Sequence, residues 1–375
     1  MSNLGQYFTT NEKLKQKVYE FILNQPTNIL EPSIGQGDLV VFIMDKLSIK
    51  FDMYEIDESI QLLDESLRND VVYGDFLTQT ITKKYKTIIG NPPYVRTKTG
   101  NLYIDFISKC INLLDDGGEL IFIVPSDFLK LTCAARLINK MFEKGNITHI
   151  FHPNDEHLFE NASIDVIIFR YCHLYTETKQ CLFNDELKYI HVNDGIITFA
   201  DTDKRQSCIN EHFNVYVGMV SGKESVYKND EYGNIDVIVG KNKINKYIYI
   251  NEYPTDSAEL NEYMEENKET LISRRIRKFN ESNWFEWGAP RNLSTINKYF
   301  GRPCIYVYNL SRADKIAFLG KVQYFGGNLI MLIPKKKCKL IPIIDYLNSE
   351  TFKKNYMYSG RFKIGHKQLA NALIL

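Results

Sequence analysis

One short segment carries the side chains best suited to chemistry: Asn91-Pro92-Pro93-Tyr94. It follows Ile88-Ile89-Gly90, which has the character of a buried strand that ends at a glycine. Asn91 offers an amide oxygen, Pro92 a main-chain carbonyl with no competing N–H, and Tyr94 a flat ring. Together they suit a planar ring held by its exocyclic amino group. A bare Asn-Pro-Pro-Tyr elsewhere in a chain would favour a simple turn.

A glycine-bearing turn, Pro32-Ser33-Ile34-Gly35-Gln36-Gly37, separates an expected strand from an apolar helix. Strand, Gly-x-Gly turn and helix are typical of a nucleotide-binding unit, although the third glycine of the dinucleotide fingerprint is missing. Glu31 at the edge of the turn disfavours a phosphate. It favours a ligand with a cationic group, such as the amino group of a methionine moiety.

Acidic residues end the next two expected strands. Glu55 stands 20 residues after Gly35, the separation at which a carboxylate accepts both hydroxyls of a ribose. Asp75 could accept from an adenine amino group while Phe76 covers the ring. Each carboxylate could also be an ordinary strand-end residue.

Aromatic residues flank these candidates in the sequence. The lead Gly5-Gln6-Tyr7-Phe8-Thr9-Thr10 could lie over a bound cofactor, or it could be only an ordered N-terminal arm. Phe169 and Tyr171 share one face of an expected strand. Tyr171 could close the other side of a base pocket, or it could pack in the core.

The order of elements predicts an α/β fold with a mostly parallel sheet covered on both faces. The expected strands are residues 28–31, 51–56, 71–73, 85–89, 119–124, 147–151 and 164–171. The expected helices are residues 14–22, 39–47, 104–114 and 134–144, with Asn11 as the cap of the first and Asp116-Gly117-Gly118 ending the third. Short strand-like runs follow after about residue 201, at residues 215–222, 235–239, 247–250, 304–308 and 329–333. We therefore expect two domains, residues 1–204 and residues 205–375.

The formal net charge is +0, but the charge is unevenly distributed. From Thr270 to the C-terminus there are 19 Lys+Arg and 5 Asp+Glu, a difference of +14; the remainder carries 27 and 41, a difference of −14. This asymmetry suggests a polyanion as partner of the C-terminal part, with a solvated basic face as the alternative. The candidates for phosphate contacts are Arg274, Arg275, Arg277, Lys278, Arg291 and Arg361. The aromatic residues interleaved with the basic ones, which could stack or wedge at bases, are Trp284, Trp287, Tyr299 and Tyr306.

The seven cysteines include no CxxC pair, which indicates a reducing compartment with neither a zinc site nor a disulfide framework. The first residues contain no apolar signal core, and no run approaches the ~18 apolar residues of a membrane span. We expect a cytoplasmic protein with no metal and no membrane association.

With these residues identified, the chain resembles the gamma group of DNA adenine-N6 methyltransferases from type II restriction–modification systems. The resemblance covers Gly5 to about Tyr171 in motif order and extends loosely over Gly218–Lys223 and Phe325–Gly327. It implies a Rossmann-like class I methyltransferase sheet of seven mostly parallel strands that binds S-adenosylmethionine. A mixed, β-rich target-recognition domain would follow and read double-stranded DNA, in a bacterial cell or the host of a DNA virus. A cognate restriction endonuclease acting on the same site is a possible partner.

The resemblance also assigns residues to roles. The cofactor site would be lined by Tyr7, Thr9, Glu31, Ser33, Gly35, Glu55, Ile56, Asp75, Phe76 and Asn91. A flipped-out adenine would be held by Asn91, Pro92 and Tyr94, with its two N6 hydrogens accepted by the Asn91 side-chain oxygen and the Pro92 carbonyl. Tyr171 matches a position where the family usually has phenylalanine, and Glu31 replaces the commoner aspartate.

Three alternatives stay open. Asn-Pro-Pro-Tyr also occurs in methyltransferases that act on RNA bases and on glutamine side chains of release factors. The position of the motifs from residue 5 onward and the basic, aromatic C-terminal part disfavour both. A catalytically silent DNA-binding subunit is the third, and the intact Asn91–Tyr94, Glu55 and Asp75 disfavour it.

Overall fold

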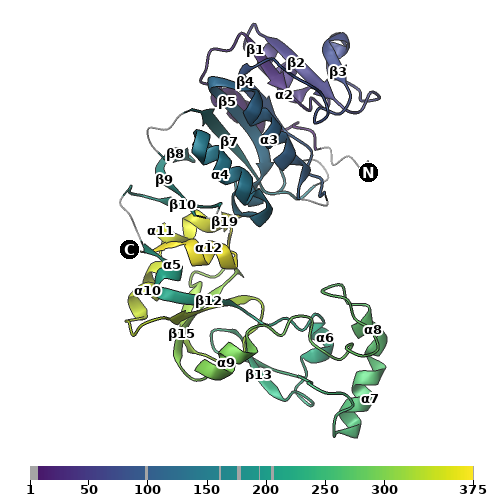
Figure 1. Cartoon of the computed structure of the whole chain (residues 1–375), viewed down its shortest axis with the longest axis vertical. Coiled ribbons are helices and arrows are strands. Elements are labelled where there is room, and N and C mark those ends of the chain that lie inside the picture. The colour runs from purple at the N-terminus through teal and green to yellow at the C-terminus, as the bar shows by residue number, and fades with distance from the viewer. Residues whose placement is uncertain are drawn as a thin grey trace. The chain divides into compact units, whose positions relative to one another are not determined.

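The computed structural model describes residues 7–97, 100–159, 162–174, 179–193, 195–203 and 207–374. The chain divides into two compact units (Figure 1). The first takes in Met1–Arg205 with Tyr358–Gly360, and the second Gln206–Met357 with Arg361–Leu375. The expected domain boundary between residues 204 and 205 lies outside the described residues and stays a prediction, as do Gly5 and Gln6 of the lead.

The first unit is built on a ten-stranded sheet with the order β10-β9-β8-β6-β7-β5-β4-β1-β2-β3. Its strands are β1 (Asn28–Glu31), β2 (Lys50–Glu55), β3 (Val71–Tyr73), β4 (Tyr85–Gly90), β5 (Leu114–Pro125), β6 (Gly145–Phe151), β7 (Val166–His173), β8 (Gln180–Phe183), β9 (Glu186–Asn193) and β10 (Ile196–Ala200). Its α-helices are α1 (Glu12–Glu20), α2 (Asp38–Met44), α3 (Leu102–Leu113) and α4 (Ala135–Lys144). Strands β1 to β5 pair in parallel, and β7 is antiparallel to both β5 and β6.

Successive residues of β5 show why helices cover both faces of this sheet. Leu120 and Phe122 belong to the core that includes α3 and α4, whereas Ile121 and Ile123 belong to the core that includes α1 and α2. Helices α3 and α4 lie side by side over one face (Figure 1). Because both faces are buried, the central strands are continuous apolar runs.

The parallel pairing gathers the carboxyl ends of β1, β2, β3 and β4 at one edge of the sheet. Glu31, Glu55 and Gly90 are the last residues of β1, β2 and β4, and Asp75 follows β3 by two positions. Open α/β sheets place their ligands at this edge. The order of elements therefore brings the candidate acidic residues close to Asn91.

The predicted fold class is confirmed, and every predicted strand and helix of the first unit is present within a few residues. One detail was wrong: Asp116-Gly117-Gly118 lies within β5, which begins directly after α3. Strands β8, β9 and β10, which extend the sheet beyond the predicted seven strands, were not predicted.

The second unit contains several small sheets, the largest with the order β12-β18-β15-β17. The remaining strands of the chain are β11 (Ser207–Cys208), β12 (Phe213–Val217), β13 (Ile235–Gly240), β14 (Lys243–Tyr247), β15 (Pro303–Tyr308), β16 (Leu310–Ser311), β17 (Ala317–Lys321), β18 (Leu329–Pro334), β19 (Met357–Tyr358), β20 (Arg361–Lys363) and β21 (Leu373–Ile374). The helices are α5 (Ile209–His212), α6 (Glu224–Tyr227), α7 (Ala258–Glu266), α8 (Lys268–Ile272), α9 (Leu293–Tyr299), α10 (Ile341–Leu347), α11 (Glu350–Lys353) and α12 (His366–Asn371). The prediction of a strand at residues 247–250 was wrong, because β14 ends at Tyr247.

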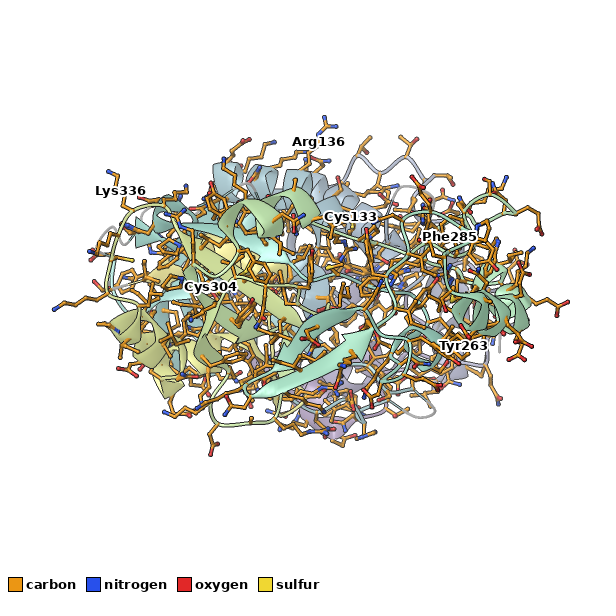
Figure 2. The ribbon with its side chains drawn as sticks, turned by 90° about the horizontal axis from the view of Figure 1, so that it is seen from below. Cys133, Arg136, Tyr263, Phe285, Cys304 and Lys336 are labelled. Carbon is orange, nitrogen blue, oxygen red and sulfur yellow. The ribbon has the colours of Figure 1, made fainter. Side chains whose placement is uncertain are left out.

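Within the second unit, Cys304 and Lys336 illustrate a buried strand residue and an exposed loop residue. Cys304 of β15 is buried among the strands, whereas the Lys336 side chain, in the loop after β18, points outward (Figure 2). None of the seven cysteines forms a disulfide bond. Among the described residues, no group of three or more His, Cys, Asp or Glu side chains could hold a metal ion. The search for a membrane-crossing helix over the same residues found none of sufficient length and apolarity.

Candidate active site

A cavity of about 960 Å³, counted with its open mouth, lies at the carboxyl edge of the sheet. The predicted cofactor residues that line it are Tyr7, Thr9, Glu31, Ser33, Gly35, Glu55, Ile56, Asp75, Phe76 and Asn91. The lining residues that were not predicted are Phe8, Pro32, Ile34, Asp38, Leu39, Gly74, Leu77, Pro93, Leu102 and Phe106. The structure thus brings all the predicted cofactor residues together.

Three glycines allow the chain around the cavity to take its path, and one of them, Gly35, lines the cavity. Gly35 and Gly37 have φ of 59° and 94°, in the left-handed region that side chains rarely adopt. Gly90 is required for a different reason: a Cβ there would lie 3.1 Å from both Glu31 Oε1 and the Phe122 ring. The absence of side chains at these positions lets β1 and β4 bring Glu31 and Asn91 to one cavity.

Glu31 is a buried carboxyl group, 2% exposed, at the floor of the turn. Its Oε1 accepts from the main-chain N–H of Ser33 at 2.9 Å. Burial raises the pKa of Glu31 to about 8, and the nearby Glu55 carboxylate adds to that rise. A carboxyl group in this setting is neutral at pH 7 unless a cation lies beside it. The site therefore suits a positively charged ligand group.

Glu55 is also buried, but its oxygens are largely engaged. Oε1 accepts from the N–H groups of Ile56 and Asp57 at 2.9 and 3.0 Å, and Oε2 accepts from Gly35 at 2.9 Å. A carboxylate has about four acceptor positions, so about one remains. Glu55 can accept one ribose hydroxyl directly, whereas the sequence suggested both.

Ile56, Asp75 and Phe76 contribute both apolar and polar groups to the cavity lining. The Ile56 side chain is 53% exposed and offers an apolar surface to a planar ring. Asp75 is exposed, and its Oδ1 accepts from Leu77 N–H at 2.9 Å. Phe76 lines the cavity but is only 2% exposed and stacks on Phe106, with ring centroids 5.4 Å apart. Its contribution to covering a ligand ring is therefore small.

Asn91 connects the cavity to the N-terminal lead. Its Nδ2 donates to the Tyr7 carbonyl oxygen at 2.7 Å and to the Thr9 hydroxyl at 3.0 Å. Its Oδ1 accepts from the Tyr94 hydroxyl at 2.5 Å. The amide oxygen keeps a second lone pair that can accept one more hydrogen bond.

Tyr94 and Pro92 do not line the cavity. The Tyr94 ring stacks on Tyr7 with centroids 5.3 Å apart and also meets the rings of Tyr103 and Phe159. The ring predicted to stack on a base is thus packed within an aromatic cluster. Phe159 was not singled out from the sequence, because it belongs to no helix or strand and follows no motif spacing.

The proposed pocket role of Tyr171 was wrong. The side chain is 0% exposed, and its hydroxyl donates to the Met141 carbonyl at 3.0 Å. It belongs to the core beneath α4. Burial is also the main cause that raises its pKa. The two-residue period placed Tyr171 on one face of β7 but could not tell that α4 covers this face.

The prediction that Arg274 of the second unit contacts a phosphate was wrong. This side chain is 8% exposed, and its guanidinium donates to the carbonyl oxygens of Leu271, Ser221 and Trp284 at 2.7, 2.8 and 2.5 Å. It also lies 3.8 Å from the centroid of the Phe279 ring. Arg274 therefore holds the local fold together and cannot contact a phosphate.

The other predicted basic residues differ in what they offer. Arg275, Lys278 and Arg291 are exposed, whereas Arg361 of β20 is half-buried. Arg277 is exposed too, but it pairs with Glu286 at 2.5 Å. The prediction that the interleaved aromatic residues reach bases was wrong for three of them. Trp284 and Trp287 are 2% exposed, and Tyr306 is 0% exposed.

Comparison with known proteins agrees with this geometry. Residues 7–159 match the family described as Eco57I restriction-modification methylase. The type II methyltransferase M.HincII of Haemophilus influenzae is 31% identical over 191 residues, which cover 45% of this chain and 37% of that protein. The type II methyltransferase M.CvrRI of Paramecium bursaria Chlorella virus XZ-6E is 33% identical over 144 residues, covering 33% and 37%. The match thus spans 37% of the length of each of these relatives.

The fold also has a counterpart among solved structures. The Type IIL restriction-modification enzyme MmeI, solved in complex with DNA, has a TM-score of 0.59 at 12% identity, over 97% of this chain and 64% of that chain. At this identity the likeness concerns the fold alone. The family resemblance thus rests on residues 7–159, which match the Eco57I restriction-modification methylase family.

Proposed function

We propose that the protein is a site-specific DNA methyltransferase that transfers a methyl group from S-adenosylmethionine to N6 of adenine in duplex DNA. It would serve as the modification enzyme of a restriction–modification system, in the cytoplasm and beside a cognate endonuclease. The observation that supports this best is the position of Asn91: its amide oxygen lies at the end of β4, at a cavity lined by Glu31, Glu55 and Asp75.

The residues of the cavity fit S-adenosylmethionine. The uncompensated carboxyl group of Glu31 suits the cationic amino group, and Glu55 retains an acceptor for a ribose hydroxyl. The exposed Ile56 side chain and the Asp75 carboxylate suit the face and the amino group of an adenine ring. When bound, this cofactor supplies an electrophilic methyl group on a sulfonium sulfur.

Asn91 and Pro92 would act on the substrate nitrogen. The lone pair of adenine N6 is delocalised into the ring, which makes N6 a poor nucleophile. If the Asn91 oxygen and the Pro92 carbonyl accept its two hydrogens, the nitrogen becomes pyramidal and its lone pair is freed. These hydrogen bonds strengthen as positive charge develops on N6, so they stabilise the transition state more than the ground state.

The target base must leave the duplex to reach Asn91. Stacking on an aromatic ring can return roughly 1–3 kcal/mol of the unstacking cost. Tyr7 covers a face of Tyr94, so a base that stacks on that face would have to displace the Tyr7 ring. Phe159 contacts both rings but is only 4% exposed, so it packs within the aromatic cluster and offers little surface to a base.

The exposed basic residues of the second unit support DNA as the partner. Arg275, Lys278 and Arg291 can neutralise phosphates, and they belong to the stretch from Thr270 to the C-terminus with 19 Lys+Arg and 5 Asp+Glu. Phosphate contacts of this kind hold the protein on the duplex and carry no sequence information directly.

A transfer assay with tritiated cofactor on duplex DNA, RNA and a release factor tests the proposal. Label in duplex DNA that is recovered as N6-methyladenine supports it. Label only in RNA or protein would contradict DNA as the substrate. No label in any of the three would contradict catalysis and favour the DNA-binding subunit without enzymatic activity.

A further inference from the structure

Two groups of the N-terminal lead accept the hydrogens of the Asn91 amide. Nδ2 donates to the main-chain carbonyl oxygen of Tyr7 at 2.7 Å and to the Thr9 hydroxyl oxygen at 3.0 Å. A main-chain carbonyl has no hydrogen to donate, so it can face the nitrogen of an amide but not its oxygen. The Tyr7 carbonyl therefore selects one of the two possible amide orientations.

The opposite side of the amide agrees with that choice. The Tyr94 hydroxyl donates to Asn91 Oδ1 at 2.5 Å, and its other neighbour is the Ile123 carbonyl oxygen at 3.2 Å. A flipped amide would place Oδ1 against the Tyr7 carbonyl, where two acceptors repel each other. The hydrogen bonds thus fix which end of the amide faces the lead.

Thr9 takes the second amide hydrogen and so fixes the tilt of the amide plane. Its side chain is only 4% exposed and comes from the segment directly before α1. The helix is anchored by Asn11, whose side chain accepts from Lys13 and Leu14 N–H. Thr9 is therefore held by ordered chain on its C-terminal side and can act as a fixed acceptor.

We infer that Thr9 is a positioning residue for Asn91: its hydroxyl and the Tyr7 carbonyl together aim Oδ1 at the substrate amino group. This inference rests on the proposed function, because the amino group meant here is adenine N6. The amide oxygen stabilises charge on that nitrogen only when it points at it. Loss of the Thr9 acceptor should therefore lower the rate of transfer much more than it lowers cofactor affinity.

The matched variants are Thr9→Val, which keeps the shape and removes the acceptor, and Thr9→Ser, which keeps the hydroxyl. We expect Thr9→Val to lower kcat by about tenfold to 10²-fold, the cost of a misplaced reacting group, with KM for DNA unchanged. Cofactor affinity of the variant, measured by calorimetry without DNA, should fall by much less than kcat does. Thr9→Ser should recover most of kcat.

A second readout does not depend on catalysis. The Asn91 side-chain amide protons, identified in spectra of asparagine-labelled protein by their loss in Asn91→Ala, should exchange with solvent faster in Thr9→Val than in Thr9→Ser. Unchanged exchange would overturn the inference even if the protein methylates nothing. If the native protein methylates DNA, a native kcat in Thr9→Val, or a parallel loss of cofactor affinity, would overturn it as well.

Discussion

The hydroxyl of Tyr94 lies 2.5 Å from the side-chain oxygen of Asn91 and donates to it. Only one of the two lone pairs of that oxygen is used by this bond. The oxygen can therefore accept from Tyr94 and from a substrate amino group at the same time. Asn91 and Tyr94 thus form one unit, in which the tyrosine supports the amide whether or not its ring stacks on a base.

Replacing Asn91 tests this unit most simply. Asn91→Ala should lower methyl transfer by at least about 10²-fold, because it removes an acceptor that acts on charge developing in the transition state. The cofactor affinity should stay nearly native, since Glu31, Glu55 and Asp75 remain in the cavity. Calorimetry and a transfer assay measure the two quantities separately. Joint loss of both would mean that Asn91 mainly shapes the cavity.

The buried carboxyl group of Glu31 predicts a pH dependence of cofactor binding. Its pKa of about 8 in the free protein means that it carries a proton at pH 7. A bound cation favours the ionised form and lowers this pKa, so binding should release a proton and tighten as pH rises from about 6 to about 7.5. Calorimetry in buffers of different ionisation enthalpy measures this proton release. Glu31→Gln should abolish it, and proton uptake by the native protein would contradict the assignment.

The same carboxyl group should make the free energy of unfolding fall as pH rises. The folded-state pKa of Glu31 is raised from 4.5 to about 8, so the folded protein holds a proton that the unfolded chain gives up. Its contribution to stability is complete below pH 4.5 and is lost as pH rises through about 8. Without cofactor, Glu31→Gln should therefore lose less stability than the native protein over this window. Denaturant unfolding at several pH values provides the comparison.

The burial of Arg274 predicts that its replacement destabilises the second unit. Arg274→Ala removes the guanidinium bonds to the carbonyl oxygens of Leu271, Ser221 and Trp284, of which Ser221 keeps the Gly288 N–H as a donor, and should cost about 3 kcal/mol. The exposed neighbour Arg275 is the matched control: Arg275→Ala should change stability by less than about 0.5 kcal/mol. If Arg275 contacts a phosphate, its loss should lower the salt slope of DNA binding by about 1. Equal stabilities of the two variants would contradict the structural role of Arg274.

Tyr171 provides a test of a corrected assignment. Tyr171→Phe removes the hydrogen bond to the Met141 carbonyl and should cost about 1 kcal/mol of stability. Methyl transfer should stay native, because the side chain is buried in the core and does not line the cavity. A fall in kcat without a fall in stability would support the original assignment of Tyr171 to the base pocket.

The cavity was predictable from the sequence because its acidic residues end apolar strands of a parallel sheet. Glu31, Glu55 and Asp75 needed only the strand periods and the rule that carboxyl ends meet at one edge. The aromatic cluster was not predictable, because Phe159 lies in an irregular segment after β6 that carries no periodic signal.

Arg274 shows a second limit of sequence reasoning. A basic run in a loop suggests exposure, but the carbonyl oxygen of Ser221 that accepts from this side chain lies far away in the sequence. Local patterns describe which residues are charged and not which of them the tertiary structure buries. The same reason explains why Trp284 and Trp287 were placed on the surface and are in fact core residues.

The central claim is that this cavity methylates adenine at N6 in duplex DNA. The most direct measurement is mass spectrometry of nucleosides from plasmid DNA treated with the native protein and with Asn91→Ala, each with S-adenosylmethionine. We predict N6-methyl-2′-deoxyadenosine after treatment with the native protein and none above background with the variant. Methylated cytosine, or the same adenine product from both proteins, would contradict the claim.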